Sequence, residues 1–217
     1  MAKLPDLPDD TAATAWLRRR YAVLLAYAFM GRQDSCISLL TADHGLDDDF
    51  LWLRLTEKQK RSSSFRRVVR IPTRPSTAHG HQSVIPHLAH VARQFIARST
   101  ALRCRRRCSH FFQLPGERPP VTADMSDWLS RTLTEVGIAA PPGFAYLGHS
   151  LRSGASSTAE AIGVSRYRGN WLGGWAQTGN TREAHYMDPS FQPTPAAFAW
   201  FGWLLSGDFD ALPPERH

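Results

Sequence analysis

The chain contains little lysine and little cysteine, and it lacks the sequence motifs of several common enzyme classes. Of its 26 lysine and arginine residues only three are lysine, namely Lys3, Lys58 and Lys60. An odd number of cysteines, three, and the lack of an apolar segment after Met1 predict a protein of a reducing compartment without a signal peptide. No run approaches the roughly 18 apolar residues of a membrane span. The nucleotide-binding Gly-x4-Gly-Lys-Ser/Thr, the zinc-binding His-Glu-x-x-His and the hydrolase Gly-x-Ser-x-Gly are absent, which argues against those three classes.

Positive charge is the most prominent feature of the composition. The 217 residues carry a formal net charge of +7, and much of the arginine lies in three short clusters. One cluster by itself is usually a solvated face, but three of them fit a polyanionic partner such as DNA better than a membrane surface. The candidate DNA contacts are Arg66, Arg67, Arg105, Arg106 and Arg107.

The order of the expected elements is a helix, a hairpin and then several helices. Apolar periodicity predicts helices over residues 11–30, 84–103, 126–136, 150–162, 166–172 and 195–205. Asp124 or Ser126 is the expected N-cap of the helix over 126–136. Two β-rich runs, 50–55 and 65–71, are separated by a polar segment and are expected to pair as a hairpin. The predicted fold class is therefore mainly α with a small antiparallel β-sheet (α+β).

Four residues whose side chains suit chemistry at a phosphate follow one another in the second half of the chain. His149-Ser-Leu-Arg152 is followed by Gly173-Gly-Trp175 and then by Tyr186. Arginine donates paired hydrogen bonds to phosphate oxygens and keeps its charge. A histidine can accept a proton, and a tyrosine hydroxyl can act as a nucleophile. Each residue alone is common in cores or at helix starts, so the order of the set is the informative feature.

This ordered set resembles the tyrosine recombinases, or phage-type integrases, and most closely the Cre-like and DIRS-type members, which carry tryptophan where other integrases have a second histidine. Further matching positions are Leu151, Gly154 and Ala155. The interval between Trp175 and Tyr186 is a couple of residues longer than is usual in the family, through Gly179-Asn180. The resemblance covers the chain from about Thr11 onwards and implies the tyrosine recombinase catalytic-domain fold.

The family also has an arginine near the start of its catalytic domain and a lysine on a β-hairpin. Arg32, directly after the first expected helix, resembles that arginine, and the alternative is an exposed helix-capping residue. Lys58 and Lys60 lie between the two expected strands. Because lysine can give up a proton in a suitable environment and arginine cannot, a proton donor is one interpretation and two solvated turn residues the other. The resemblance favours Lys58 as the donor.

The resemblance implies DNA strand cleavage and rejoining through a 3′-phosphotyrosyl intermediate. Tyr186 would be the nucleophile, Arg32 and Arg152 would bind the phosphate, and His149 would assist the proton transfer. Trp175 would brace the site through its indole N–H. No metal and no cofactor are expected, since the phosphotyrosyl bond conserves the energy of the phosphodiester. Cys104, Cys108 and His110 could suggest zinc, but they lack a well-formed second ligand pair.

The expected partners are double-stranded DNA and further copies of the chain, arranged on DNA as a tetrameric synapse. No membrane partner is expected, and the expected location is at DNA, in the cytoplasm (nucleoid) or in the nucleus. Two alternatives stay open. One is a type IB topoisomerase, which relaxes DNA by similar chemistry, and the other is an inactive DNA-binding remnant of a mobile element.

The expected domain organisation is a short tail over residues 1–10, a catalytic domain over 11–189 and a C-terminal tail over 190–217. The tail contains residues 195–205, which are apolar on almost every face of a helix. Such a helix needs burial on all sides. It belongs either to the chain's own core or, as the Cre resemblance implies, in a neighbouring subunit.

Overall fold

The structure is a computed structural model of the chain. It describes residues 10–59, 62–73, 85–103, 108–192 and 194–205. The first half contains α1 (Asp10–Ala28), α2 (Gln33–Ile37), the 3-10 turn η1 (Thr41–Asp43), β1 (His44–Leu46), β2 (Phe50–Gln59), β3 (Ser62–Pro72) and α3 (Ile85–Arg103). The second half contains α4 (Thr122–Glu135), α5 (Gly148–Ala161), α6 (Arg166–Gly173), α7 (Thr181–Tyr186), α8 (Pro195–Phe201) and η3 (Gly202–Leu204). The predicted class, mainly helical with a small antiparallel sheet, is confirmed.

α1 is the central helix of the fold. Leu17, Tyr21 and Leu25 recur at every fourth position, so they share one face, and all three are fully buried. α1 contacts α3, α4 and α5, and Phe95 of α3 packs on the Tyr21 ring. Because helices on several sides cover α1, it needs the apolar-rich sequence of residues 11–30.

The sheet consists of three antiparallel strands in the order β1-β2-β3. Leu53 is the register point that links them, since it lies opposite His44 of β1 and Val69 of β3. Leu51, Leu53 and Leu55 are buried while Arg54 is exposed, the alternation of a sheet with one face on the core. The hairpin predicted from the sequence is therefore present, with both strands longer than expected.

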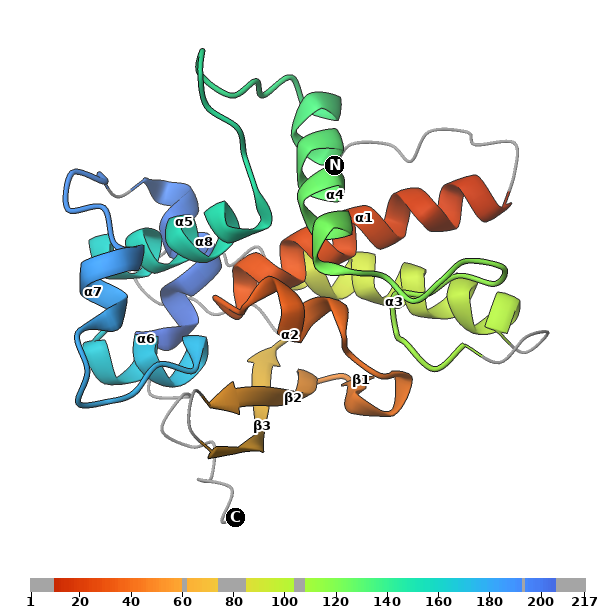
Figure 1. Cartoon of the computed structure of the whole chain (residues 1–217), viewed down its shortest axis with the longest axis horizontal. Coiled ribbons are helices and arrows are strands. Elements are labelled where there is room, and N and C mark those ends of the chain that lie inside the picture. Colours follow the sequence, from red (N-terminus) through yellow and green to blue (C-terminus); the bar gives the residue numbers. More distant parts are fainter. Residues whose placement is uncertain (1–9, 60–61, 74–84, 104–107, 193, 206–217) are drawn as a thin grey trace.

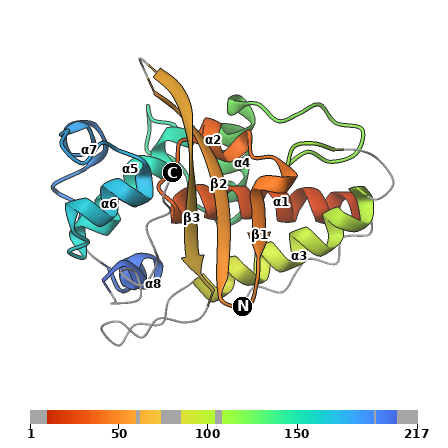
Figure 2. The same ribbon diagram turned by 90° about the horizontal axis from the view of Figure 1, so that it is seen from below.

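The helices that follow α4 gather on one side of the molecule. Figures 1 and 2 both show α5, α6, α7 and α8 together, with α1 and α3 on the other side and the sheet beside them. α8 is shorter than the predicted 195–205 helix, because the chain tightens into η3 at Gly202. Phe201 and Trp203 are buried in this chain, and the Phe201 ring packs 5.6 Å from that of Tyr27 in α1.

Two local predictions about helices differ from the structure. α4 begins four residues earlier than expected, with Val121 as N-cap instead of Asp124 or Ser126. Asp124 lies in the first turn of α4, and its carboxylate accepts a hydrogen bond from the Val121 N–H at 2.7 Å. The acidic side chain therefore stabilises the helix start from within the first turn and not from the N-cap position. α7 was not predicted, because its six residues contain no apolar periodicity.

Candidate active site

Three helical segments bring four of the predicted residues together. His149 and Arg152 lie on the first turns of α5, Trp175 follows α6, and Tyr186 ends α7. The Tyr186 ring centroid is 4.9 Å from that of His149 and 5.3 Å from that of Trp175. Cζ of Arg152 lies 3.7 Å from the Trp175 ring centroid and 5.0 Å from the Tyr186 ring centroid. The arginine, the tryptophan and the tyrosine therefore form one continuous contact, with histidine at its edge.

Arg152 is the buried centre of this cluster. Its residue is 2% exposed, whereas Tyr186 is half-buried and His149 is exposed. Nη1 of Arg152 donates hydrogen bonds to the carbonyl oxygens of Met30 at 2.6 Å and Gly173 at 2.9 Å. Two carbonyls and two aromatic faces stabilise a buried guanidinium that is charged at neutral pH.

The carbonyl of Met30 is presented by an unusual backbone. Met30 has a φ of 51°, in the left-handed region that residues other than glycine rarely adopt. This conformation directs the chain out of α1 and towards Arg32, the first arginine predicted for the site. Met30 therefore combines a strained backbone with the carbonyl that accepts a hydrogen bond from Arg152. It lies two residues before Arg32.

The Gly173-Gly-Trp sequence has a steric explanation. Gly174 is the left-handed C-cap of α6, with a φ of 70°. A side chain at Gly173 would collide with the Trp175 ring. The two glycines therefore allow the chain to turn back at once, so that the tryptophan ring folds over the end of α6 and lies on Arg152. The Trp175 Nε1 atom is buried and has no hydrogen-bond partner within the described residues.

Two further predicted site residues lie at the start of α2 and in β2. Arg32 is exposed and is the N-cap of α2, two residues after Met30. Lys58 lies in β2 at an irregularity of the β2–β3 pairing, between Glu57 and Gln59. Lys60 and the three arginines Arg105, Arg106 and Arg107 lie outside the described residues.

Arg66 and Arg67 are part of β3, on the antiparallel hairpin. Their Cα partners on β2 are Thr56 for Arg66 and Leu55 for Arg67. This places both arginines on the same hairpin as Lys58, close to it in register.

Sequence reasoning missed two residues next to this cluster, Arg182, which lies near Trp175, and Ser156, which binds Arg182. Arg182, one turn before Tyr186 on α7, is buried and lies 6.0 Å from the Trp175 ring centroid. Its Nε donates a 2.9 Å hydrogen bond to the hydroxyl of Ser156, one turn after Arg152 on α5. The available signal was the four-residue spacing of both pairs, which places Arg182 and Tyr186, and Ser156 and Arg152, on common helix faces.

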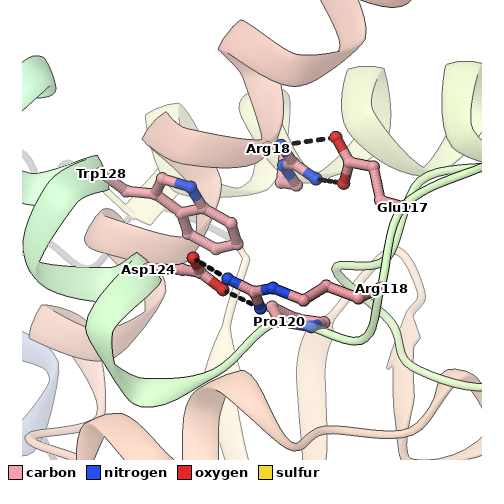
Figure 3. A pocket seen from close by; sticks show the side chains of 6 residues that line it. All are labelled: Arg18, Glu117, Arg118, Pro120, Asp124 and Trp128. Carbon is pink, nitrogen blue, oxygen red and sulfur yellow. Dashed lines mark hydrogen bonds and ion pairs between the residues drawn. The ribbon is translucent and has the colours of Figure 1, made fainter.

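A separate cavity of about 350 Å³ lies between α1, α4 and the segment before α4. Figure 3 shows its lining, in which Arg18 pairs with Glu117 and Arg118 with Asp124, beside the ring of Trp128. The charged groups neutralise one another within the wall, and none of the lining residues belongs to the Arg152 cluster. The cavity therefore does not extend the candidate active site.

Within the described ranges, no group of three histidine, cysteine or acidic side chains is arranged to hold a metal ion. None of the helices in those ranges combines the length and the hydropathy that a bilayer-spanning segment needs.

Similarity to known proteins is confined to the fold. No protein-family model matches the chain, and no curated protein matches it in sequence. Two crystal structures of the XerH site-specific recombinase are similar, one a post-cleavage complex with a palindromic difH substrate and the other a pre-cleavage complex with difH. The post-cleavage structure has a TM-score of 0.57 and 12% identity over 76% of this chain, and the pre-cleavage structure 0.54 and 13% over 77%.

The chain spans only part of these recombinases, 41% and 44% of their lengths. At this identity the similarity establishes the architecture alone. The mainly helical fold with its three-stranded sheet matches that of tyrosine recombinase structures, as the sequence resemblance predicted.

Proposed function

We propose that the chain cleaves and rejoins DNA strands through a covalent bond between Tyr186 and a 3′-phosphate. The observation that carries this proposal is the contact of Tyr186 with Arg152, within a fold that matches site-specific recombinases. A tyrosine ring against a buried, permanently charged guanidinium is suited to attack on a phosphate that the same guanidinium binds. Trp175, on which the guanidinium lies, supports the narrower assignment to Cre-like or DIRS-type members.

In the proposed reaction, Tyr186 Oη attacks the phosphorus and forms a new P–O bond, while the bond to the 5′-oxygen breaks. Arg152 and Arg32 stabilise the negative charge that grows on the non-bridging oxygens. His149, whose ring packs on that of Tyr186, accepts the phenol proton or hydrogen-bonds to it, because a neutral phenol is a weak nucleophile. Lys58 protonates the leaving 5′-oxygen. The 5′-hydroxyl of a second strand then attacks the phosphotyrosine and regenerates the free tyrosine.

Trp175 has a narrower role in the same proposal. Its indole N–H is a donor and never an acceptor, so it can hydrogen-bond a phosphate oxygen but cannot replace histidine as a base. The stacking of Arg152 on the same ring means that Trp175 also fixes the plane of the guanidinium.

A nicked suicide DNA substrate tests the proposal. After cleavage beside the nick, the short 5′-hydroxyl strand diffuses away, so religation stops and the covalent intermediate accumulates. We expect a protein–DNA adduct that survives denaturing electrophoresis and disappears on protease treatment. An intact substrate after prolonged incubation with bound protein would favour the inactive DNA-binding remnant instead.

DNA binding through the arginine clusters predicts a strong dependence on salt. The logarithm of the affinity for duplex DNA should fall linearly with the logarithm of salt concentration, with a slope of roughly −0.9 per phosphate contacted. Replacing Arg105, Arg106 and Arg107 by alanine should reduce this slope by about two to three units. Arg131→Ala on α4, an exposed arginine paired with Asp127, is the matched control and should leave the slope unchanged. An equal slope in the triple variant would remove residues 105–107 from the DNA-binding surface.

Assembly and topology separate the proposed recombinase from a type IB topoisomerase. The recombinase is expected to join two DNA molecules as a tetramer, whereas the topoisomerase relaxes one supercoiled molecule as a monomer. Relaxation of a plasmid without the formation of recombinant products would favour the topoisomerase. The packing of Phe201 and Trp203 in their own chain shows where this segment lies in a single molecule, and its docking on a neighbouring subunit stays a prediction.

A further inference from the structure

The helix that carries Tyr186 has almost no apolar anchor of its own. α7 comprises the six residues Thr181–Tyr186, and Arg182 is its buried residue, while Tyr186 is half-buried and Ala184 exposed. A helix this short is not stable in isolation, so its position depends on tertiary contacts. The position of the proposed nucleophile therefore depends on how α7 is attached to the rest of the fold.

Arg182 provides that attachment through directional contacts with α5. Its side chain is 0% exposed. Nε donates to the Ser156 hydroxyl at 2.9 Å and Nη2 to the Ser156 carbonyl at 3.2 Å. Nη2 also lies 3.3 Å from Oε2 of Glu160. Burial lowers the pKa of the Arg182 guanidinium, and the Glu160 and Glu183 carboxylates partly offset this effect.

The contacts between α5 and α7 form two successive levels. Arg152, Ser156 and Glu160 are four residues apart along α5 and therefore lie on one face of that helix. Arg182 and Tyr186 are likewise four residues apart on α7. Arg182 is hydrogen-bonded to Ser156, and Tyr186 contacts Arg152. The contact of Arg182 with Ser156 therefore restricts the position of Tyr186 relative to Arg152. Beyond Tyr186, the Asp188 N–H donates to the Ser157 hydroxyl at 2.8 Å and holds the chain on the far side.

The third element of this attachment is α6. A Cβ atom at Gly169 would lie 2.7 Å from Arg182 Cζ, so the guanidinium rests directly on the backbone of α6. Arg182 is thus held between α5 and α6 and comes only two residues after Gly179-Asn180, the segment that lengthens the interval between Trp175 and Tyr186. A longer loop constrains the tyrosine less. The contacts of the Arg182 guanidinium restore the constraint on the position of Tyr186 directly after this loop.

We propose that Arg182 is a positioning residue that sets the register of α7 on α5 and so holds Tyr186 beside Arg152. This inference rests on the proposed function of Tyr186 as nucleophile. Apolar contacts are non-directional, whereas three polar contacts to Ser156 and Glu160 define a single register of a short helix. A change of register by one residue would turn Tyr186 away from Arg152.

The decisive measurement is single-turnover cleavage of the suicide substrate at saturating protein, beside hydrogen exchange of the backbone amides. Arg182→Met keeps an unbranched apolar side chain of several atoms and removes the polar contacts of the guanidinium. We expect its cleavage rate to fall by about 10²-fold, the effect of a displacement of roughly 1 Å in a reacting group. The Kd for DNA should not change, and exchange should accelerate in residues 181–188 but not in α1. Arg182→Lys should recover only part of the rate, because lysine keeps the charge but lacks the planar fork.

A second variant displaces the guanidinium without removing it. Gly169→Ala places a methyl group against Arg182, while alanine favours the α6 helix more than glycine does. It should lower the cleavage rate in the same direction as Arg182→Met. Arg131→Met on α4 removes an exposed arginine of the same length and should leave cleavage and exchange at wild-type values.

The two arms separate this inference from the proposed function. If Arg182→Met cleaves the substrate at the wild-type rate, the positioning role is overturned. Faster hydrogen exchange throughout the chain would also overturn it, since Arg182 would then support the whole fold. If the wild-type protein forms no adduct, the proposed function fails. Hydrogen exchange of the Arg182→Met variant then decides alone. Unchanged protection of residues 181–188 would overturn the anchoring of α7 by Arg182, and faster exchange confined to these residues would support it.

Discussion

Replacing Tyr186 by phenylalanine is expected to abolish the covalent adduct with DNA. The variant loses one oxygen, the atom that attacks phosphorus, and keeps the ring that packs on His149, Trp175 and Arg152. Without the hydroxyl no phosphotyrosine can form, so adduct formation should fall below detection in the suicide-substrate assay. DNA affinity, measured by gel shift at the same salt concentration, should remain close to that of the wild type. Loss of the adduct together with unchanged binding assigns the nucleophile.

Tyr167 provides the control for this experiment. It lies on α6 and is 62% exposed, so its hydroxyl is the more accessible of the two. Tyr167→Phe should form the adduct at the wild-type rate, because its neighbours Arg166 and Arg168 bind Glu183 and the Leu204 carbonyl, whereas Tyr186 lies against Arg152. An adduct with Tyr186→Phe that vanishes on replacing Tyr167 would transfer the nucleophilic role to α6 and contradict the proposed site.

Replacing Lys58 by alanine is expected to slow cleavage by ~10²–10⁴-fold, the usual contribution of a positioned proton donor. Lys58→Arg should recover little activity, because arginine supplies charge but no transferable proton at neutral pH. A substrate with sulfur in place of the bridging 5′-oxygen should restore much of the lost rate, since a thiolate leaves without protonation. The measurement is the single-turnover rate on matched oxygen and sulfur substrates.

Lys60→Ala is the matched control, since it removes the other of the two lysines that lie close together in the sequence. Its rate should fall less, and sulfur substitution should change it little. If sulfur restores the rate of Lys60→Ala and not that of Lys58→Ala, the two lysines exchange roles. Equal rates of both variants with the wild type would make both lysines solvated surface residues, the alternative that the sequence left open.

The elements with strong periodicity could be predicted from the sequence. The buried four-residue spacing of Leu17, Tyr21 and Leu25 and the alternation through Leu51, Leu53 and Leu55 are local consequences of helix and strand geometry, and both agree with the structure. The order of His149, Arg152, Trp175 and Tyr186 was also visible, because chemical identity and spacing are properties of the chain alone. α7 was missed since its attachment depends on an arginine, a residue that usually indicates a solvated face.

The sequence by itself determined the fold class, the basic charge and the order of the candidate catalytic residues. The tertiary structure decided which of those residues meet. Arg152 donates a hydrogen bond to the carbonyl of Met30, 122 positions earlier, and Arg182 donates one to the hydroxyl of Ser156 on another helix. Contacts over such separations are set by how helices pack, and packing depends on the whole core at once. Local patterns carry no information about the partner of a single polar side chain, so the surroundings of Arg152 and the role inferred for Arg182 required the folded chain.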